Sequence, residues 1–159
     1  MTVCIDTMVL IWAVRGFRTG ESPTDPLVDR TKAWLADLAT NKATVLVPAP
    51  VIGEYLAGVD SAQQSAAAAQ LSKQFPVAAY GLVAAVRFAE LWHVAYGSGR
   101  PGADGRRHKV DMQIVACALA SRADALYSHN DDVRKCAAGR IPVREVPPPK
   151  PAAQPLPGV

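Results

Sequence analysis

The stretch Val3-Cys4-Ile5-Asp6-Thr7 places a carboxylate directly after a short apolar run. A short apolar run that ends at a polar residue indicates a buried strand. The apolar residues that follow, through about Ala13, predict a helix. Acidic side chains rarely stand beside hydrophobic runs unless something positive neutralises them. The stretch therefore predicts a strand and a helix with a carboxylate at their junction.

Three further groups of acidic or amide side chains stand beside apolar strands or helices. They are Glu54, Asp111, and the run Asn130, Asp131 and Asp132. If the fold gathers these side chains around Asp6, the result is an oxygen-only pocket of the kind that Mg²⁺ or Mn²⁺ occupies. In a basic protein, such a pocket indicates chemistry on a phosphate backbone.

Short apolar strands alternate with helices along the chain. We expect strands at residues 3–5, 44–47, 75–79, 125–127 and 141–146, and helices at 7–13, 26–39, 50–58, 61–73, 82–96, 112–120 and 131–138. This alternation predicts an α/β fold with a mainly parallel sheet that is covered on both faces. In such sheets ligands bind at the carboxyl ends of the strands, near the point where the strand order reverses. All four acidic positions are expected to face that edge.

Length and composition bound the class of protein. At 159 residues the chain is expected to form one domain, over residues 1–146, followed by a disordered tail at 147–159 with six prolines. Cys4, Cys117 and Cys136 show no C-x-x-C spacing, which is typical of a reduced cytosolic protein. No signal segment is visible and no apolar run reaches the length of a membrane span. We therefore expect a cytoplasmic protein without membrane contact.

The net charge of +3 is unevenly placed. The segment from Gly97 to Lys109 carries four basic residues against Asp104 alone; they are Arg100, Arg106, Arg107 and Lys109. One interpretation is a solvated loop. The other is an arm that contacts phosphates beside the acidic site, because cationic contacts supply most of the sequence-independent affinity for nucleic acids.

Each acidic position also has a structural interpretation. Asp6 and Asp111 would serve as helix N-caps, worth about 1 kcal/mol each. Glu54 would be an anion favoured by the helix dipole, and Asn130 and Asp131 would be turn or cap residues. From the residue types alone, capping and catalysis both stay open.

Four segments resemble, in order, the motifs of PIN-domain ribonucleases. Residues 4–12 contain an Asp-Thr pair that ends a strand ahead of an apolar helix, and residues 48–54 place a glutamate inside a short helix. Residues 109–116 contain an aspartate that opens a buried helix, and residues 126–133 contain a serine followed two positions later by an amide. The resemblance covers about residues 2–146. Size and single-domain layout are similar to those of the VapC-like toxins of bacterial toxin–antitoxin pairs.

The resemblance implies a PIN-like three-layer α/β/α sandwich and metal-dependent hydrolysis of RNA phosphodiester bonds. The implied catalytic residues, which also hold Mg²⁺ or Mn²⁺, are Asp6, Glu54 and Asp111, with Asn130 assisting and Asp131 or Asp132 as possible substitutes. The RNA backbone would be held by Arg106, Arg107 and Lys109. Thr7 and Ser128 would orient a carboxylate or a water, or would only cap helices. The implied partners are RNA, a second copy of the chain in a homodimer, and a cognate antitoxin.

Two positions depart from the family pattern. Met8 replaces a polar residue that often follows the Asp-Thr pair, and Asn130 stands where many members carry aspartate. These departures motivate the alternative of an inactive PIN-like module that binds RNA or a protein partner. A phosphatase of similar architecture is disfavoured, because it would need a second aspartate at the position of Met8. The chain also lacks a glycine-rich nucleotide loop, which argues against a kinase or a dinucleotide-dependent dehydrogenase.

Overall fold

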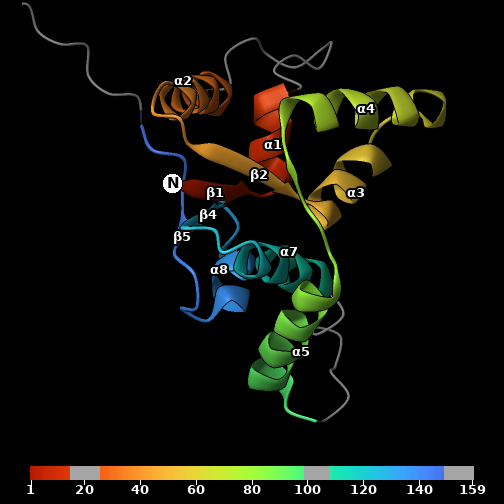
Figure 1. Ribbon diagram of the computed structural model, residues 1–159, viewed down its shortest axis with the longest axis vertical. Helices are drawn as coiled ribbons and strands as arrows, with labels where there is room; N and C mark the ends of the chain where they lie inside the picture. The colour runs from red at the N-terminus through yellow and green to blue at the C-terminus, as the bar shows by residue number, and fades with distance from the viewer. Residues whose placement is uncertain (15–25, 99–107, 149–159) are drawn as a thin grey trace, which may run out of the picture.

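A five-stranded sheet forms the centre of the molecule (Figure 1). The computed structural model describes residues 1–14, 26–98 and 108–148. The strands are β1 (Thr2–Ile5), β2 (Thr44–Pro48), β3 (Val77–Ala78), β4 (Ala125–Tyr127) and β5 (Val143–Arg144). They lie in the order β3-β2-β1-β4-β5, and every pairing is parallel. The predicted α/β fold with a parallel sheet is confirmed.

Helices cover the two faces of the sheet in separate layers (Figure 1). The first layer holds α1 (Thr7–Val14), α2 (Pro26–Thr40), α3 (Ala49–Ala57) and α4 (Gln64–Gln74), with a short 3₁₀ turn, η1 (Ser61–Gln63), before α4. The second layer holds α5 (Leu82–Tyr96), α7 (Lys109–Ala120) and α8 (Asp131–Ala137). Within the layers α1 packs on α2 and α3, while α5 and α8 pack on α7. The chain therefore has the expected three-layer arrangement.

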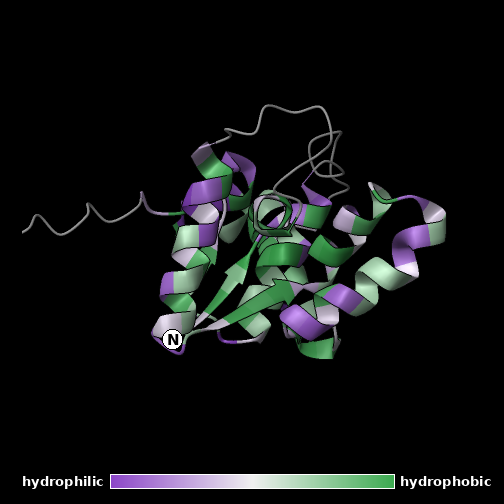
Figure 2. Cartoon of the chain, turned by 90° about the horizontal axis from the view of Figure 1, so that it is seen from above, coloured by the Kyte–Doolittle hydropathy of each residue, from purple (hydrophilic) through white to green (hydrophobic). Residues whose placement is uncertain are grey.

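The core lies between β1 and the helices on either side of it. Val3, Cys4 and Ile5 of β1 are fully buried. Helix α7 is buried on nearly all sides, as its apolar sequence predicted; its buried residues are Met112, Ile114, Val115, Ala116, Cys117 and Ala118. The central strands are hydrophobic while the outer helices carry hydrophilic residues (Figure 2). This pattern fits a parallel sheet that is covered on both faces.

The two edge strands are shorter than predicted. The strand expected at 75–79 is only Val77–Ala78, and the one expected at 141–146 is only Val143–Arg144. Each follows a proline, which has no amide hydrogen to donate to a ladder. The carbonyls of these prolines still accept bonds, since Val47 N lies 3.0 Å from Pro76 O and Leu126 N lies 2.9 Å from Pro142 O. The prolines therefore join the sheet without extending the strands.

The three cysteines are free and buried. Burial raises the thiol pKa of Cys4 and Cys136 to about 12, and that of Cys117 to about 11. These thiols are therefore protonated at neutral pH, and they act as small core side chains.

Several predictions fall on residues outside the described ranges. They concern the loop at 15–25, the tail from residue 149 onward, and Arg100, Arg106 and Arg107 of the basic segment. Within the ranges that the structure describes, none of the helices is both long and apolar enough to span a bilayer.

A matched pair of leucines tests where the core lies. Leu126 in β4 is fully buried, whereas the side chain of Leu82 at the start of α5 is 82% exposed. Leu126→Ala is expected to lower the free energy of unfolding by about 3 kcal/mol, because it leaves a cavity between the two helical layers. Leu82→Ala is expected to change it by less than about 0.5 kcal/mol. Urea denaturation measures both, and similar losses would contradict this placement of the core.

Candidate active site

Asp6 lies at the carboxyl end of β1, where the strand order reverses. From β1 the chain proceeds to β2 and β3 on one side, while β4 and β5 lie on the other. The Asp6 amide donates to Tyr127 O of β4 at 3.0 Å. Its carboxylate accepts from Val9 N at 2.9 Å and so caps α1. Asp6 is only 4% exposed, which makes it a buried acid at the place where α/β folds bind ligands.

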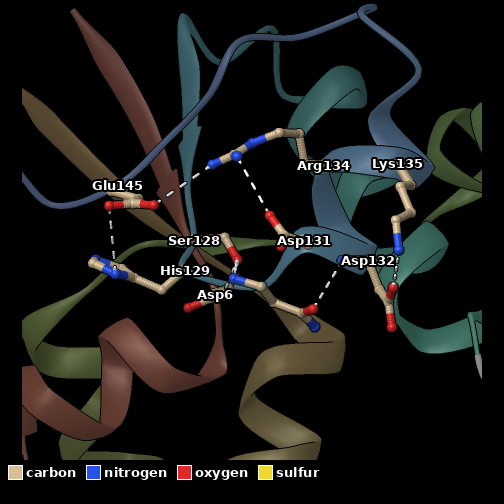
Figure 3. A network of polar contacts seen from close by, with 9 residues as sticks. Asp6, Ser128, His129, Asp131, Asp132, Arg134, Lys135 and Glu145 are labelled. Atoms are coloured by element: carbon tan, nitrogen blue, oxygen red, sulfur yellow. Dashed lines mark hydrogen bonds and ion pairs between the residues drawn. The ribbon is translucent and has the colours of Figure 1, made fainter.

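Ser128 holds the Asp6 carboxylate from the neighbouring strand. It follows β4 directly, is fully buried, and donates its hydroxyl hydrogen to Oδ2 of Asp6 (Figure 3). The same hydroxyl oxygen accepts from Asn130 N at 3.0 Å. Burial raises the pKa of Asp6, and the bonds from Ser128 and Val9 oppose this shift by stabilising the ionised form.

Glu54 reaches the same region from α3. Its carboxylate accepts a hydrogen bond from the hydroxyl of Thr7, the first residue of α1. Glu54 is the sixth residue of α3, beyond the first turn where a helix dipole favours an anion, so the dipole interpretation is wrong. The charge of Glu54 raises the pKa of both Asp6 and Asp111, which places the three carboxylates close together.

Asp111 lies in the first turn of α7 and is half-buried. The helix begins at Lys109, three residues earlier than predicted, and His108 occupies the N-cap position. The interpretation of Asp111 as an N-cap is therefore wrong. The pKa of Asp111 is raised to about 6, first by burial and then by the charges of Glu54 and Asp132, with a smaller effect from Asp6. Crowding of like charges is typical of a site that holds a cation.

Asn130 and the two following acids have different roles in the structure. Asn130 caps α8, since its side-chain oxygen accepts from Asp132 N at 2.9 Å. It also makes a long contact of 3.5 Å from Nδ2 to Oδ1 of Asp111. Asp131 is 80% exposed and faces Arg134 at 3.4 Å (Figure 3). Asp132 is 19% exposed, and its charge acts on Asp111. Of the two possible substitutes, Asp132 is the one that lies near Asp6, Glu54 and Asp111. These four acids are called the acidic group below.

Two contacts of His108 were not predicted from the sequence. Its Nδ1 lies 2.9 Å from the Tyr96 hydroxyl, and its Nε2 lies 3.7 Å from Oδ2 of Asp132. No spacing rule could have identified them, because they join α5, the start of α7 and α8. His108 therefore connects the acidic group to the outer helix α5.

Of the basic residues predicted to hold RNA, only Lys109 lies within the described ranges. Lys109 is exposed and forms no ion pair with any residue that the structure describes. Arg106 and Arg107 lie outside the described ranges, so their expected contacts with RNA stay predictions.

The acidic group has the donors that a hard divalent cation needs. Its ligand atoms are oxygens, and after burial the neighbouring charges of Glu54 and Asp132 contribute to the raised pKa of Asp111. Within the described residues, however, no three His, Cys, Asp or Glu side chains already converge so that they could hold a metal ion. Asp6 and Glu54 are each turned toward a hydroxyl, so metal binding requires side-chain rotation. The donor chemistry fits, and the rotamers would have to adjust.

Comparison with known proteins identifies the fold family. The PIN domain profile matches residues 3–139. No curated protein sequence matches the chain at a significant level. Among solved structures, the chain is similar to a chain in the crystal structure of VapBC2 from Rickettsia felis bound to a DNA fragment from its promoter. That match has a TM-score of 0.62 at 15% identity and covers 91% of this chain and 98% of the other, so it shows a shared fold. With the PIN profile spanning most of its length, the chain belongs to the PIN domain family.

Proposed function

We propose that this chain is a metal-dependent endoribonuclease that hydrolyses RNA phosphodiester bonds, and that it is the toxin of a toxin–antitoxin pair. PIN domains are typically nucleases. The observation that carries the proposal is the grouping of three carboxylates at the reversal point of the sheet. Asp6, Glu54 and Asp111 come from three different elements, yet their charges act on one another. A helix cap does not require such a grouping.

In this proposal Asp6, Glu54 and Asp111 hold Mg²⁺ or Mn²⁺, with Asn130 assisting and Asp132 close by. The chemistry supplied by the bound cation is activation of a water nucleophile and neutralisation of charge on the phosphoryl oxygens. Thr7 and Ser128 act as positioning residues. Thr7 donates a hydrogen bond to Glu54, and Ser128 donates one to Oδ2 of Asp6, whose Oδ1 accepts from Val9 N.

Lys109, together with Arg106 and Arg107, would hold the RNA backbone beside these acids. Lys109 lies two residues before Asp111 on the same helix, which keeps a cation near the site of hydrolysis. Electrostatic contacts of this kind supply affinity without sequence preference.

The proposed partners are a second copy of the chain and a cognate antitoxin. The fold match to a VapBC2 chain supports the antitoxin partner, whereas the homodimer is what the resemblance to VapC-like toxins implies. An antitoxin arginine inserted between Asp6, Glu54 and Asp111 would satisfy the same carboxylates that otherwise hold the metal. Inhibition would then be a competition between a guanidinium and a divalent cation.

Two observations favour the alternative of a catalytically weak or inactive module that binds RNA or protein. Within the described residues the carboxylates do not converge on a common point, and an amide stands at Asn130. This alternative predicts that RNA binding persists with a chelator, and that no cleavage appears with Mn²⁺.

Asp6→Asn separates catalysis from capping. The variant is expected to fold, because asparagine caps a helix nearly as well as aspartate. It is expected to lose Mg²⁺- or Mn²⁺-dependent cleavage of a structured RNA mixture, because the buried ligand loses its charge. Asp131→Asn is the matched control; it removes an exposed carboxylate outside the group and should leave cleavage unchanged. A folded Asp6→Asn protein that cleaves like the parent would rule out the catalytic assignment.

Asp111→Asn tests the electrostatic crowding through stability. Because the pKa of Asp111 is raised to about 6 in the folded state, the ionised carboxylate destabilises the metal-free fold above that pH. Such a shift corresponds to about 3 kcal/mol, which solvent screening of a half-exposed group reduces to about 1 kcal/mol. In EDTA at pH 7.5 the variant is expected to be more stable by that amount. Below about pH 3 the difference should vanish, because the carboxyl is then protonated in both the folded and the unfolded parent.

The same pair of proteins in excess Mg²⁺ should show the opposite order, because only the parent gains binding free energy from the cation. Urea denaturation at each pH, with and without Mg²⁺, gives the full comparison. If Asp111→Asn had the same effect at about pH 3 and at pH 7.5, the acids would not be crowded in the way described.

A further inference from the structure

A hollow of about 380 Å³ lies between α5 and the start of α7. Its volume is within the range of small-ligand pockets. Its lining residues are Phe88, Ala89, Trp92, His93, Gly97 and Lys109. Helix α5 packs against α7. Lys109 is the lining residue from α7, and the others belong to α5 and its C-cap, Gly97.

One wall of the hollow belongs to a row of aromatic side chains on α5. Phe88, Trp92 and Tyr96 follow at four-residue spacing and lie on one face of the helix. The ring centroids of Phe88 and Trp92 are 5.5 Å apart, and those of Trp92 and Tyr96 are 5.0 Å apart. All three rings are only partly buried. Partly exposed rings in a row are what single-stranded nucleic acid uses as a stacking surface.

The other wall supplies positive charge. Lys109 is exposed and makes no ion pair with the described part of the chain, so its ammonium group is available to a ligand. The one acid of α5, Glu90, forms ion pairs with Arg87 at 3.0 Å and with Arg140 at 3.1 Å. The hollow therefore combines aromatic rings with a cation, which suits a base and its phosphate better than an apolar peptide.

Contacts connect the aromatic row to the acidic group. Tyr96 lies 2.9 Å from His108 Nδ1, and His108 Nε2 lies 3.7 Å from Asp132. Asp132 in turn acts on Asp111 through its charge. Lys109 lies in the same first helical turn as Asp111, but side chains two residues apart point to different sides of a helix, so the connection runs through His108. An RNA strand that lies across the acids can therefore reach the hollow.

We propose that this hollow binds an unpaired nucleobase of the RNA, stacked on Trp92, with a neighbouring phosphate paired to Lys109. The proposal rests on the proposed function, because it names the class of RNA that the acidic site would act on. Bases in a duplex are already stacked on one another and cannot enter a side pocket without unpairing. The hollow thus selects single-stranded segments and loops over duplex RNA.

Binding without cleavage gives the test, using the full chain in EDTA. The probes are a fluorescein-labelled single-stranded oligoadenylate and an RNA duplex of equal length. Trp92→Leu is expected to weaken binding of the single strand about tenfold, which corresponds to about 1.4 kcal/mol and is typical of one stacked base. Duplex binding should stay within twofold. Trp92→Phe should retain most of the affinity, because a ring remains.

Val94→Ala is the control on the same helix. Val94 is 60% exposed and does not line the hollow, so its removal should leave both affinities unchanged. Lys109→Gln should weaken single strand and inorganic polyphosphate alike and reduce the salt dependence of binding by about one charge. This difference separates stacking from phosphate contact.

Tryptophan emission gives a readout that needs no variant to fold. Trp12 and Trp34 are only 8% and 7% exposed, so Trp92 is the indole within reach of a bound base. Unlabelled oligoadenylate is expected to quench the emission of the parent, whereas polyphosphate should not. Absence of quenching at saturating oligoadenylate would overturn the proposal.

Two further outcomes are equally decisive. If folded Trp92→Leu binds the single strand as tightly as the parent but changes its sedimentation coefficient, the hollow is a protein contact and the proposal is wrong. If Trp92→Leu weakens the binding of both RNAs equally, the proposed selectivity for unpaired bases is wrong.

A separate outcome concerns the ribonuclease function. A parent that stacks oligoadenylate in EDTA but never cleaves RNA with Mg²⁺ or Mn²⁺ would remove the ribonuclease function and leave the binding site in place.

Discussion

The parallel pairing of β1 with β4 is the constraint on which the rest of the structure depends. It sets Ile5 opposite Tyr127, so that Asp6 and Ser128, 122 residues apart, meet just beyond the strands. The hydroxyl of Ser128 holds the Asp6 carboxylate, and the Ser128 oxygen accepts from the Asn130 amide at the start of α8. Because α1, α3 and α7 also converge on this edge, Glu54 and Asp111 are brought to the same place. A slip of one residue in this register would point Asp6 to the opposite face of the sheet.

Burying the carboxylates of the acidic group lowers the stability of an otherwise well-packed fold. The surrounding β1, β4 and α7 are almost wholly apolar and exclude water, and burial is the first cause of the raised pKa of both Asp6 and Asp111. Hydrogen bonds from Ser128 and Val9 offset part of this cost at Asp6, but they supply no positive charge. A divalent cation or an arginine would supply it. The crowded carboxylates would be stabilised by positive charge, and this one requirement underlies both the proposed metal binding and the proposed inhibition by an antitoxin.

The proposed functions are divided between different parts of the fold. Acidic ligands come from strand ends and from helices on both faces, whereas the aromatic row and Lys109 belong to α5 and α7 on one face only. His108 joins the two regions, because it contacts Tyr96 on one side and Asp132 on the other. Cleavage of the RNA and recognition of its unpaired bases would thus depend on neighbouring but separate side chains. Such an arrangement allows substrate preference to change without loss of the acids.

Hydrophobic patterning predicted the α/β class, the parallel sheet and the buried α7, because strands and helices are encoded by local periodicity. It also placed Asp6, Glu54, Asp111 and Asn130 at the ends of strands or in the helices that follow them. The family was predicted from the resemblance of four motifs. Local pattern did not show that Asp132 rather than Asp131 joins the acids, that Asp111 lies inside α7 instead of capping it, or that Pro76 and Pro142 shorten the edge strands. Those features depend on strand order, helix start and side-chain direction. They are decided by which residues the completed fold brings into contact, a property that no single segment carries.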